Sequence, residues 1–247
     1  MHIRPEQIEL FKQIMKEAGS LLLSFWSKPV LIMKKGKSIV TPADLAVEKF
    51  LIDRLSALVP EANFLAEESG LSGDSTDSYQ WVIDPLDGTR NFARHIPYFC
   101  ISVALTHHDD PLIAAIYNPL LDELFFAIKG QPASCNGTLI RVSQGVVLTE
   151  STIVVRPDRM HDIVGQVAAV RHMGAIALDL ANLAAGRFDG IVFSGVNWWD
   201  IAAGALILTQ AGGTIADLNG ALISSKQQSC VAGGYPVFDH LYQKLKD

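Results

Sequence analysis

Two aspartates three residues apart lie in one turn at the end of an apolar run. Residues 81–92 read WVIDPLDGTRNF, so that β-favouring side chains lead to Asp84 and Asp87 with a proline between them. Carboxylates are the hard oxygen ligands that Mg²⁺ takes, usually together with phosphate oxygens of a substrate. A helix that starts behind Gly88 and Thr89 would turn its backbone N–H groups toward that phosphate. The segment therefore predicts a site for a divalent cation and a phosphate, although Asp-Pro and Asp-Gly also occur in ordinary turns.

Three other segments place acidic residues at the ends of predicted elements, where catalytic groups are frequently found. These residues are Asp44 in the first turn of a helix, Glu67 after a strand, and Asp200 where a long apolar helix begins. Each also has a purely structural interpretation, because an acid in a first turn favours the helix dipole and Asp is a common N-cap. Carboxylates gathered from four segments would repel one another without cations. Two Mg²⁺ ions about 3.5–4 Å apart require carboxylates from several segments, one of which bridges both ions.

Composition restricts the class of protein. The chain has 247 residues, of which 49% are hydrophobic and 19% are charged, which is enough to bury a large core. Its net charge of -6 argues against a nucleic-acid surface, where basic patches are expected. No apolar run approaches the roughly 20 residues of a membrane span, and the amphipathic start does not resemble a signal peptide. The 3 cysteines fit neither a disulfide framework nor a zinc pattern, so we expect a reduced, cytoplasmic protein.

Motifs of competing chemistries are absent from the sequence. No G-x-G-x-x-G follows a predicted strand, no histidines have the H-E-x-x-H spacing, and no serine lies in a G-x-S-x-G elbow. Residues 35–38 end like a phosphate-binding loop, but Leu31 stands where that motif requires glycine.

The hydrophobic periodicity predicts the elements that must position these residues. Apolar residues at three- and four-residue spacings predict helices over 5–27 and from Pro42 to Pro60, with Thr41 as the N-cap of the second. A hairpin or loop is expected over 28–38. Short apolar runs between turn residues predict strands over 63–66, 80–83, 99–106, 112–117 and 123–128, with a hairpin at Asn136-Gly137.

The second half of the chain alternates differently. We expect helices over 160–169, 175–185 and 200–210, strands over 190–193, 214–217 and 230–232, and a terminal helix. Helical and strand segments without a linker predict a layered α/β fold in a single domain that spans residues 1–247.

The motifs together resemble those of one family. The segments are T-P-A-D-L (41–45), A-E-E-S (66–69), W-V-I-D-P-L-D-G-T-R-N-F (81–92), W-D-I-A-A-G (199–204) and Q-A-G-G (210–213). In type and order they are similar to those of the inositol monophosphatase family of Mg²⁺-dependent, lithium-sensitive phosphatases. The resemblance covers nearly the whole chain. It implies the family's αβαβα sandwich, usually a homodimer, and hydrolysis of a small phosphorylated metabolite, such as inositol 1-phosphate, by direct attack of metal-activated water.

The resemblance also implies a role for each site residue. Two or three Mg²⁺ ions would be held by Glu67, Asp84, the carbonyl of Leu86, Asp87 and Asp200. Thr89 and Asp44 would orient the attacking water, and Glu67 would assist through the third ion. The backbone of Gly88 and Thr89 would bind the phosphate. The rest of the substrate would contact Asp87, Ile176, Phe193 and Asp200.

Two features depart from the family pattern. The segment between Gly137 and Arg171 is shorter than usual, which would trim one helix or a dimer surface. The family's inositol phosphatases usually place an acid seven positions before the aspartate of W-D, and this chain has Phe193 there. We therefore expect modest turnover of inositol 1-phosphate and better turnover of a substrate with an apolar or aromatic portion. The alternative is that Phe193 packs inward and that Ser194 or Asn197 forms the polar wall.

Other functions remain open at this point. A 3′(2′),5′-bisphosphate nucleotidase or a fructose-1,6-bisphosphatase-type sugar phosphatase would use the same metal ligands. Residues 90–92 resemble the inositol-phosphatase version of the motif better than the K-E-F version of the nucleotidases. A regulatory or binding protein could also use this fold without catalysis, because fold alone does not establish function.

Overall fold

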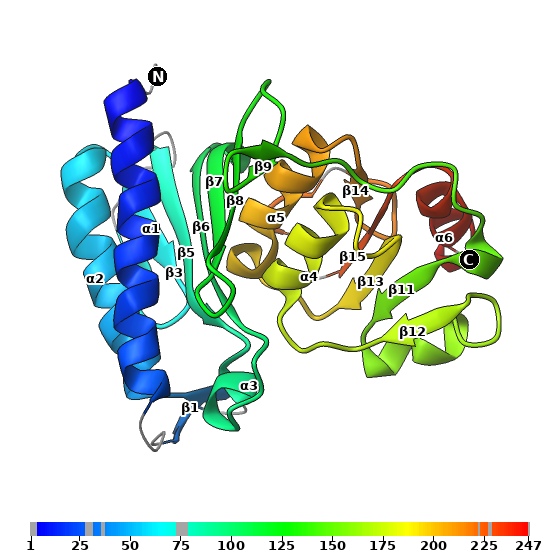
Figure 1. Cartoon of the computed structure of the whole chain (residues 1–247), viewed down its shortest axis with the longest axis horizontal. Coiled ribbons are helices and arrows are strands. Elements are labelled where there is room, and N and C mark those ends of the chain that lie inside the picture. Colours follow the sequence, from blue (N-terminus) through cyan, green and yellow to red (C-terminus); the bar gives the residue numbers. More distant parts are fainter. Residues whose placement is uncertain are drawn as a thin grey trace.

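Helices and β-sheets alternate in layers in this chain. The computed structural model describes residues 4–27, 32–35, 38–72, 79–221, 223–226 and 229–246. Within these ranges, helices cover the outer face of each of the two larger sheets and also fill the space between them (Figure 1). The arrangement is the αβαβα sandwich that the family resemblance implies. None of the described helices is both long and apolar enough to cross a bilayer.

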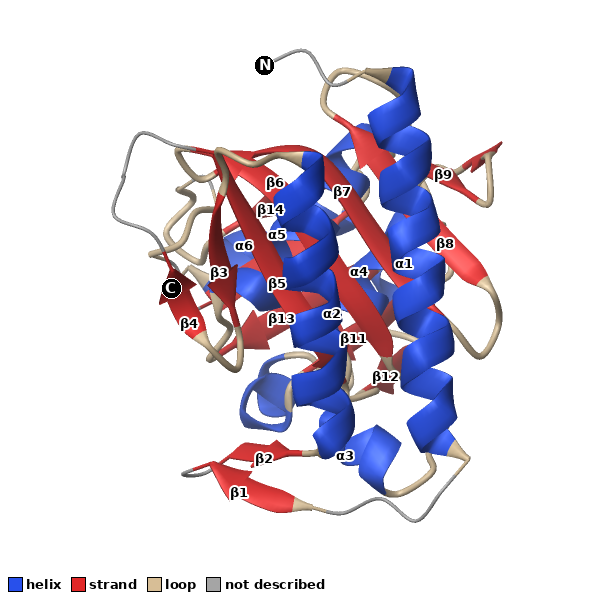
Figure 2. Ribbon diagram, turned by 90° about the vertical axis from the view of Figure 1, so that its left-hand side faces the viewer, coloured by secondary structure: helices blue, strands red, loops and turns tan. Residues whose placement is uncertain are grey.

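The first layer consists of α1 (Pro5–Trp26) and α2 (Pro42–Leu58), which lie side by side across the larger sheet (Figure 2). Both helices bury one apolar stripe against that sheet, as amphipathic helices do. The start of α2 is fixed by Thr41, whose hydroxyl oxygen accepts the N–H of Ala43 at 3.2 Å. Pro42 is tolerated at the first helical position because its missing N–H has no partner there in any helix.

The larger sheet has eight strands in the order β10-β9-β8-β7-β6-β5-β3-β4. They are β3 (Asn63–Ala66), β4 (Gly70–Ser72), β5 (Tyr79–Asp87), β6 (Cys100–His107), β7 (Asp110–Asn118), β8 (Glu123–Ile128), β9 (Ser134–Cys135) and β10 (Thr138–Leu139). β3 and β5 run parallel, with Ala66 opposite Ile83. Because their carboxyl ends meet at the same edge, the acidic residue after β3 comes close to the aspartates at the end of β5.

The helices between the sheets are α4 (Ile176–Ala184) and α5 (Trp198–Gln210). Both are buried on nearly every side, as expected for helices covered by a sheet on each face. Their close packing depends on Gly204, because a Cβ atom at that position would lie only 2.6 Å from the Cβ of Leu180. Any larger residue would push α5 away from α4 and move the start of α5.

The smaller sheet has five strands in the order β12-β11-β13-β15-β14. They are β11 (Thr152–Val155), β12 (Ala169–Arg171), β13 (Gly190–Ser194), β14 (Thr214–Ala216) and β15 (Ser229–Gly233). Their side chains alternate between the two faces: Val154 and Phe193 pack in the central cluster with α4 and α5, whereas Val192 packs on the outer side. The outer side is covered by α6 (Val237–Leu245).

The helix expected over 160–169 is wrong. The chain forms a short 3₁₀ helix, η2 (Pro157–Asp162), then turns, and then enters β12. Gly165 lies at a φ of +86°, which no α-helix contains. The preceding β-branched run forms β11, which pairs in parallel with both β12 and β13. The local helical pattern was therefore overridden by strand pairing that only the tertiary structure supplies.

The other expected elements are confirmed within a few residues in the described part of the chain. β5 is longer than expected and extends through Asp84 to Asp87, and the short strand β4 was not predicted. Asn136-Gly137 forms the expected turn between β9 and β10. In the expected hairpin over 28–38, β1 (Met33–Lys35) pairs with β2 (Ser38–Val40), while residues 28–31 and 36–37 lie outside the described residues.

Candidate metal and phosphate site

The turn that carries the two aspartates is a β-bulge at the end of β5. Asp84 pairs with Ser102 and Asp87 with Cys100, so β5 has one more residue than β6 in this interval. Bulges redirect side chains, and both aspartates are buried here, at 2% and 8% exposure. The Asp84 carboxylate accepts the N–H of Leu86 at 3.0 Å. These contacts fix the two carboxylates in a single orientation at the sheet edge.

Asp87 links the larger sheet to the layer of helices between the sheets. One of its carboxylate oxygens accepts the N–H of Ala177, in the first turn of α4, at 2.6 Å. The N–H groups at a helix start have no partner inside the helix, and they favour negative charge. The two segments are 90 residues apart in the chain. Asp87 therefore sets the position of α4 relative to the bulge.

Thr89 and Asp44 are in direct contact, as the predicted pairing requires. The Thr89 hydroxyl lies 3.1 Å from a carboxylate oxygen of Asp44 and 3.0 Å from the carbonyl oxygen of Leu86. The other carboxylate oxygen of Asp44 accepts the N–H and the hydroxyl of Thr41, at 2.8 and 2.6 Å. Asp44 is fully buried, so it does more than favour the dipole of α2.

Gly88 precedes the short helix α3 (Thr89–Ala93) and has a φ of +94°. A Cβ atom at this position would lie 3.0 Å from the carbonyl oxygen of Tyr98 and 3.1 Å from the Cβ of Ala175. Glycine is therefore required both by the left-handed backbone and by the lack of space.

The remaining two acids also lie at element ends. Glu67 follows β3, and its N–H donates to the carbonyl of Ile83 at 3.2 Å. Asp200 lies in the first turn of α5 and accepts the N–H of Asn197 at 2.6 Å. Asp200 is therefore not the N-cap expected from the sequence: the helix begins at Trp198, Asn197 is the N-cap residue, and Asp200 is the third helical residue, which binds back to the N–H of that cap. A capping role leaves the second carboxylate oxygen of Asp200 available for another ligand.

Glu48 is a positioning residue that the sequence did not reveal. Its carboxylate oxygens accept the N–H groups of Glu68 and Ser69 at 2.8 and 2.9 Å. The side chain is only 4% exposed, and it holds the turn that carries Glu67. A signal was present: Glu48 lies four residues after Asp44, so both face the same side of α2 as the buried Val47 and Leu51.

A second group of polar residues holds the loop before α4, and the sequence did not reveal it either. The amide nitrogen of Asn91 donates to the carbonyls of Tyr98 and Met173, at 2.7 and 2.9 Å. The Tyr98 hydroxyl donates to the buried carboxylate of Asp179 at 2.6 Å and accepts from Asn182 at 3.1 Å. The only available signal was two polar residues within the otherwise apolar helix α4.

The acids are close enough to raise one another's pKa. Burial is the main cause, and it raises the pKa of Glu67 to about 8 and that of Asp200 to about 6. Burial also raises the pKa of Asp44 to about 6. The pKa of Asp84 is raised well above its ordinary value by burial and then by repulsion from Glu67, Asp87 and Asp200. The fold therefore brings four predicted metal ligands from β3, β5 and α5 together.

Comparisons with known proteins agree with this geometry. The model of the inositol monophosphatase family matches residues 5–246. The chain belongs to this family. The family is metal-dependent, so the cluster of acids has a known counterpart.

Individual relatives cover most of the chain. Inositol monophosphatase 2 of Solanum lycopersicum is 35% identical over 236 residues, which are 87% of this chain and 88% of the relative. Nus factor SuhB of Escherichia coli K12 is 34% identical over 248 residues, which are 94% and 92% of the two chains. The crystal structure of extragenic suppressor protein suhB from Bartonella henselae superposes with a TM-score of 0.91 at 32% identity, covering 97% of this chain and 98% of that one. Because some relatives are named as Nus factors, the expected lack of a nucleic-acid partner stays a prediction.

The residues fit the metal ions of the inositol monophosphatase family by their chemistry. Four carboxylates and the Leu86 carbonyl are all hard oxygen donors, and a cation would relieve the repulsion among the acids. Within the described ranges, no group of three or more His, Cys, Asp or Glu side chains is already arranged to hold a metal ion. Instead, Glu67 is hydrogen-bonded to Asp84, and the other acids accept backbone N–H groups.

A cavity of about 300 Å³ adjoins two of these acids. Asp87, Ile176, Phe193 and Asp200, the residues expected to contact the substrate, all line this cavity, and their role in binding stays a prediction. Phe193 is only 3% exposed and belongs to the central apolar cluster, so it is both a core residue and a wall residue. Ser194 faces the other way and donates its hydroxyl to Asp158, so it is not the polar wall.

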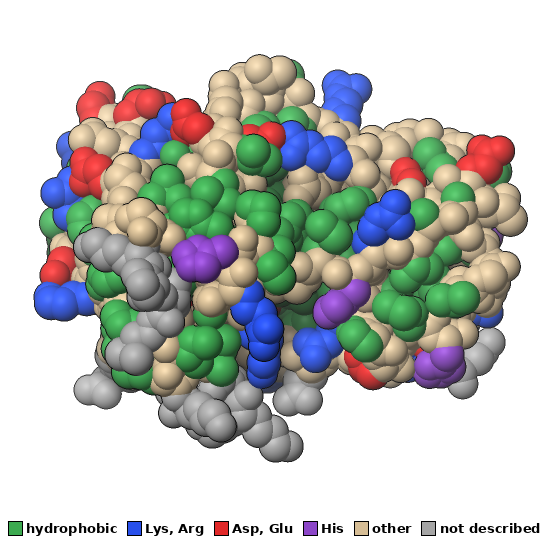
Figure 3. Space-filling model, turned by 60° about the horizontal axis from the view of Figure 1, so that its bottom comes forward, with side chains coloured by type: hydrophobic (Ala, Val, Ile, Leu, Met, Phe, Trp, Pro, Cys, Tyr) green, Lys and Arg blue, Asp and Glu red, His purple; other side chains and the backbone are tan. Residues whose placement is uncertain are grey.

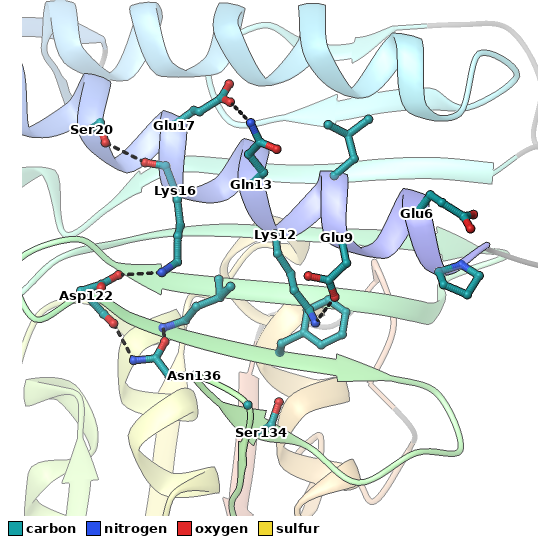
Figure 4. Close-up of a pocket in the computed structure, with 15 residues that line it drawn as sticks. Glu6, Glu9, Lys12, Gln13, Lys16, Glu17, Ser20, Asp122, Ser134 and Asn136 are labelled. Carbon is teal, nitrogen blue, oxygen red and sulfur yellow. Dashed lines mark hydrogen bonds and ion pairs between the residues drawn. The ribbon is translucent and has the colours of Figure 1, made fainter.

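A larger groove lies elsewhere. It has a volume of about 1260 Å³ and runs between α1 and the strands β8 and β9 with the turn that follows β9 (Figure 4). Its charged side chains are already paired, Lys12 with Glu9 at 2.8 Å and Lys16 with Asp122 at 3.2 Å. It contains none of the acids described above, so its size does not make it the metal site.

We expect the metal-free protein to lose thermal stability as the pH rises from about 5 to 8, and Mg²⁺ to restore it. Folding raises the pKa of Glu67 from 4.5 to about 8 and that of Asp44 and Asp200 from 3.8 to about 6. Between these values the folded protein binds more protons than the unfolded chain, so raising the pH costs stability. Mg²⁺ binds the ionised carboxylates and therefore stabilises the fold more at the higher pH.

The measurement is the Tm by calorimetry at pH 5.5 and 8, in EDTA and in Mg²⁺, with NaCl at equal ionic strength as the control. A gain in Tm from Mg²⁺ that is the same at both pH values would contradict this electrostatic description.

Proposed function

We propose that this chain is a Mg²⁺-dependent phosphomonoesterase, built as one phosphatase domain, that acts on a small phosphorylated metabolite of the inositol 1-phosphate type. The supporting observation is the gathering of Glu67, Asp84, Asp87 and Asp200 beside the Thr89–Asp44 contact. Membership of the inositol monophosphatase family supports the same reaction class.

The proposed metal ligands divide into overlapping sets. Glu67, Asp84 and the Leu86 carbonyl would hold one ion, and Asp84, Asp87 and Asp200 a second, while Glu67 would reach a third through water. When bound, Mg²⁺ lowers the pKa of a coordinated water and neutralises charge on the phosphate. Asp84 is the residue common to both main sets. Its buried position at the bulge between β3 and β6 supports that assignment.

The chain's own residues would orient the nucleophile. The Thr89 hydroxyl can donate its single proton to Asp44, which leaves an oxygen lone pair to accept a proton from the attacking water. Asp44 is held by two hydrogen bonds from Thr41, so the pair has one geometry. An acceptor that is already in position lowers the activation free energy, because its orientation is fixed before the reaction begins. The N–H groups of Gly88 and Thr89 would bind the phosphate oxygens.

Substrate binding beyond the phosphate is assigned to the adjoining cavity. Asp87, Ile176, Phe193 and Asp200 border it and would contact the alcohol portion of the ester. A bisphosphate nucleotidase or a sugar bisphosphatase would use the same metal ligands, and the choice depends on this wall. We further propose a homodimer, by family resemblance, and a cytoplasmic location, which the free cysteines Cys100, Cys135 and Cys230 support.

A second candidate function is a regulatory or binding role on the same fold. The observation that favours it is the similarity to proteins named Nus factor SuhB. A screen for phosphate release over a panel of phosphorylated metabolites with Mg²⁺ separates the two candidates. Release above the no-enzyme rate supports the phosphatase, whereas none over the whole panel leaves the regulatory role.

Asp84→Asn should reduce turnover at saturating Mg²⁺ to less than about a tenth of the wild-type value, because the amide lacks the charge that offsets two dications. The assay is phosphate release from the best substrate of the panel. Asp53→Asn is the matched control, because Asp53 is exposed and pairs with Lys49 on the surface of α2. If Asp84→Asn keeps more activity than this, the two-metal assignment is wrong.

Thr89→Ala should lower kcat about 10²–10⁴-fold and change KM little, because the hydroxyl would act on the water rather than on bound substrate. Thr89→Ser keeps the hydroxyl and should recover most of the loss. Steady-state kinetics on the same substrate measure both parameters. A large rise in KM with unchanged kcat would instead make Thr89 a ligand of the bound phosphate.

A further inference from the structure

The cavity beside Asp87 and Asp200 has basic residues on its wall. Arg90, Arg156 and His172 border it together with the two acids. Lys, Arg and His side chains are also visible near the middle of the face that Figure 3 turns forward. In the proposed phosphatase both Asp87 and Asp200 are occupied by cations. The charged groups of the wall that remain to contact the rest of the substrate are then mainly Arg90 and Arg156.

Arg156 is placed on this wall by the smaller sheet. It directly follows β11, and its N–H donates to the carbonyl of Val192 in β13 at 3.2 Å. Val154, two residues earlier, packs in the central cluster with α4 and α5, so strand alternation directs Arg156 toward the same layer. Burial raises the pKa of Asp200, and the positive charge of Arg156 opposes that rise, which places this charge near the Asp200 carboxylate. The Arg156 side chain borders the cavity and is 44% exposed, so the guanidinium lies at the rim of the site.

The guanidinium of Arg156 lacks a full set of acceptors. Its Nε is buried and has no hydrogen-bond partner within the described part of the chain. One carboxylate oxygen of Asp158 forms an ion pair with Nε at 3.7 Å, beyond hydrogen-bond distance, and the other oxygen accepts the Ser194 hydroxyl. A guanidinium carries five N–H donors, and a buried donor without an acceptor costs free energy. An anionic group entering the cavity would supply the missing acceptor.

The rest of the wall offers little to an uncharged polyol. Phe193, Ile176 and Val196 border the cavity and provide apolar surface. Asp179 also borders it, but its carboxylate already accepts the Tyr98 hydroxyl at 2.6 Å. Sugar-type hydroxyls would therefore lose water and gain few protein acceptors, so inositol 1-phosphate would be turned over only modestly.

We propose that the alcohol portion of the substrate carries an anionic group of its own, a carboxylate or a second phosphate, and that Arg156 recognises it. Arginine is suited to this, because its planar fork binds either group through two parallel hydrogen bonds. A cavity of about 300 Å³ is at the small end for ligand sites, so the substrate is compact. This inference rests on the proposed phosphatase function, of which it specifies the substrate class.

The test compares phosphate esters that differ in a single group. 2-Phosphoglycerate and glycerol 2-phosphate are identical except that a carboxylate replaces one CH₂OH, and fructose 1,6-bisphosphate adds a second phosphate to fructose 1-phosphate. We expect kcat/KM with Mg²⁺ to favour the anionic member of at least one pair by about tenfold or more, because hydrogen bonds between charged groups are the stronger ones. The pair that shows the preference identifies carboxylate or phosphate as the recognised group.

Arg156→Met keeps the length of the side chain and removes its charge, so the preference should fall to about threefold or less. Arg156→Lys keeps the charge but not the fork and should recover only part of it. Phe193→Glu should also reduce the preference, because it adds a negative charge to the same wall. Arg171→Met is the matched control: Arg171 is exposed, donates to the carbonyl of Val170, and does not border the cavity. It should leave the preference unchanged.

Binding of the same esters by calorimetry, with Ca²⁺ in place of Mg²⁺ to slow turnover, separates this inference from the proposed function. Turnover of both members of each pair without preference would overturn the inference and leave the phosphatase intact. The other outcome is that the anionic member binds more tightly, that Arg156→Met abolishes this difference, and that no ester releases phosphate. This result would support the inference and contradict the proposed phosphatase function. Equal binding of both members by the wild-type protein would overturn the inference in either case.

Discussion

Repulsion among buried carboxylates is the constraint around which this structure is organised. Four of the five acids at the site are held by N–H groups at the end of a helix or at a turn: Asp44 by Thr41, Asp84 by Leu86, Asp87 by Ala177 and Asp200 by Asn197. These donors have no partner within a helix, so they can bind a carboxylate without disrupting secondary structure. The same contacts offset part of the burial cost that raises the pKa of every acid in the cluster. The helix starts and turns that supply these N–H groups therefore also place the acids at one point.

The contacts that hold the acids also join the two halves of the chain. Asp87 reaches the start of α4, Asn91 binds the carbonyl of Met173, and Tyr98 donates to Asp179. The three residues of the first half that make these contacts, Asp87, Asn91 and Tyr98, lie within or just after the segment D-P-L-D-G-T-R-N-F. The motif thus supplies ligands and at the same time docks the larger sheet onto the helices between the sheets. A change in this segment is therefore expected to affect both the activity and the packing of α4.

The sequence was informative wherever one segment contained both the residue and its environment. The turn of Asp84 and Asp87, the N-cap Thr41 and the strand before Glu67 are local patterns, and the structure has all three. Glu48 and Arg156 could not be identified in this way, because the partners that give them a role come from other elements: β-turn N–H groups for Glu48, and β13 and the cavity for Arg156. The helix expected over 160–169 failed for the same reason. Its periodicity was local, but β11 and β12 pair with strands that the local pattern does not contain.

The alternation of side chains along β13 decides whether Phe193 or Ser194 borders the cavity, a question that the sequence left open. Ile191 and Phe193 pack against the helices between the sheets, whereas Val192 packs on the outer side. Because alternate residues of a strand face opposite sides, Ser194 must also face outward, and its hydroxyl does bond to Asp158 there. A shift of one residue would have exchanged these positions and made the wall polar. The cavity wall is apolar at this point because the register of β13 is fixed on both sides, by β11 and β15. The apolar part of the substrate wall is therefore set by the packing of the smaller sheet, whereas three of the four proposed acidic metal ligands, Glu67, Asp84 and Asp87, come from the larger one.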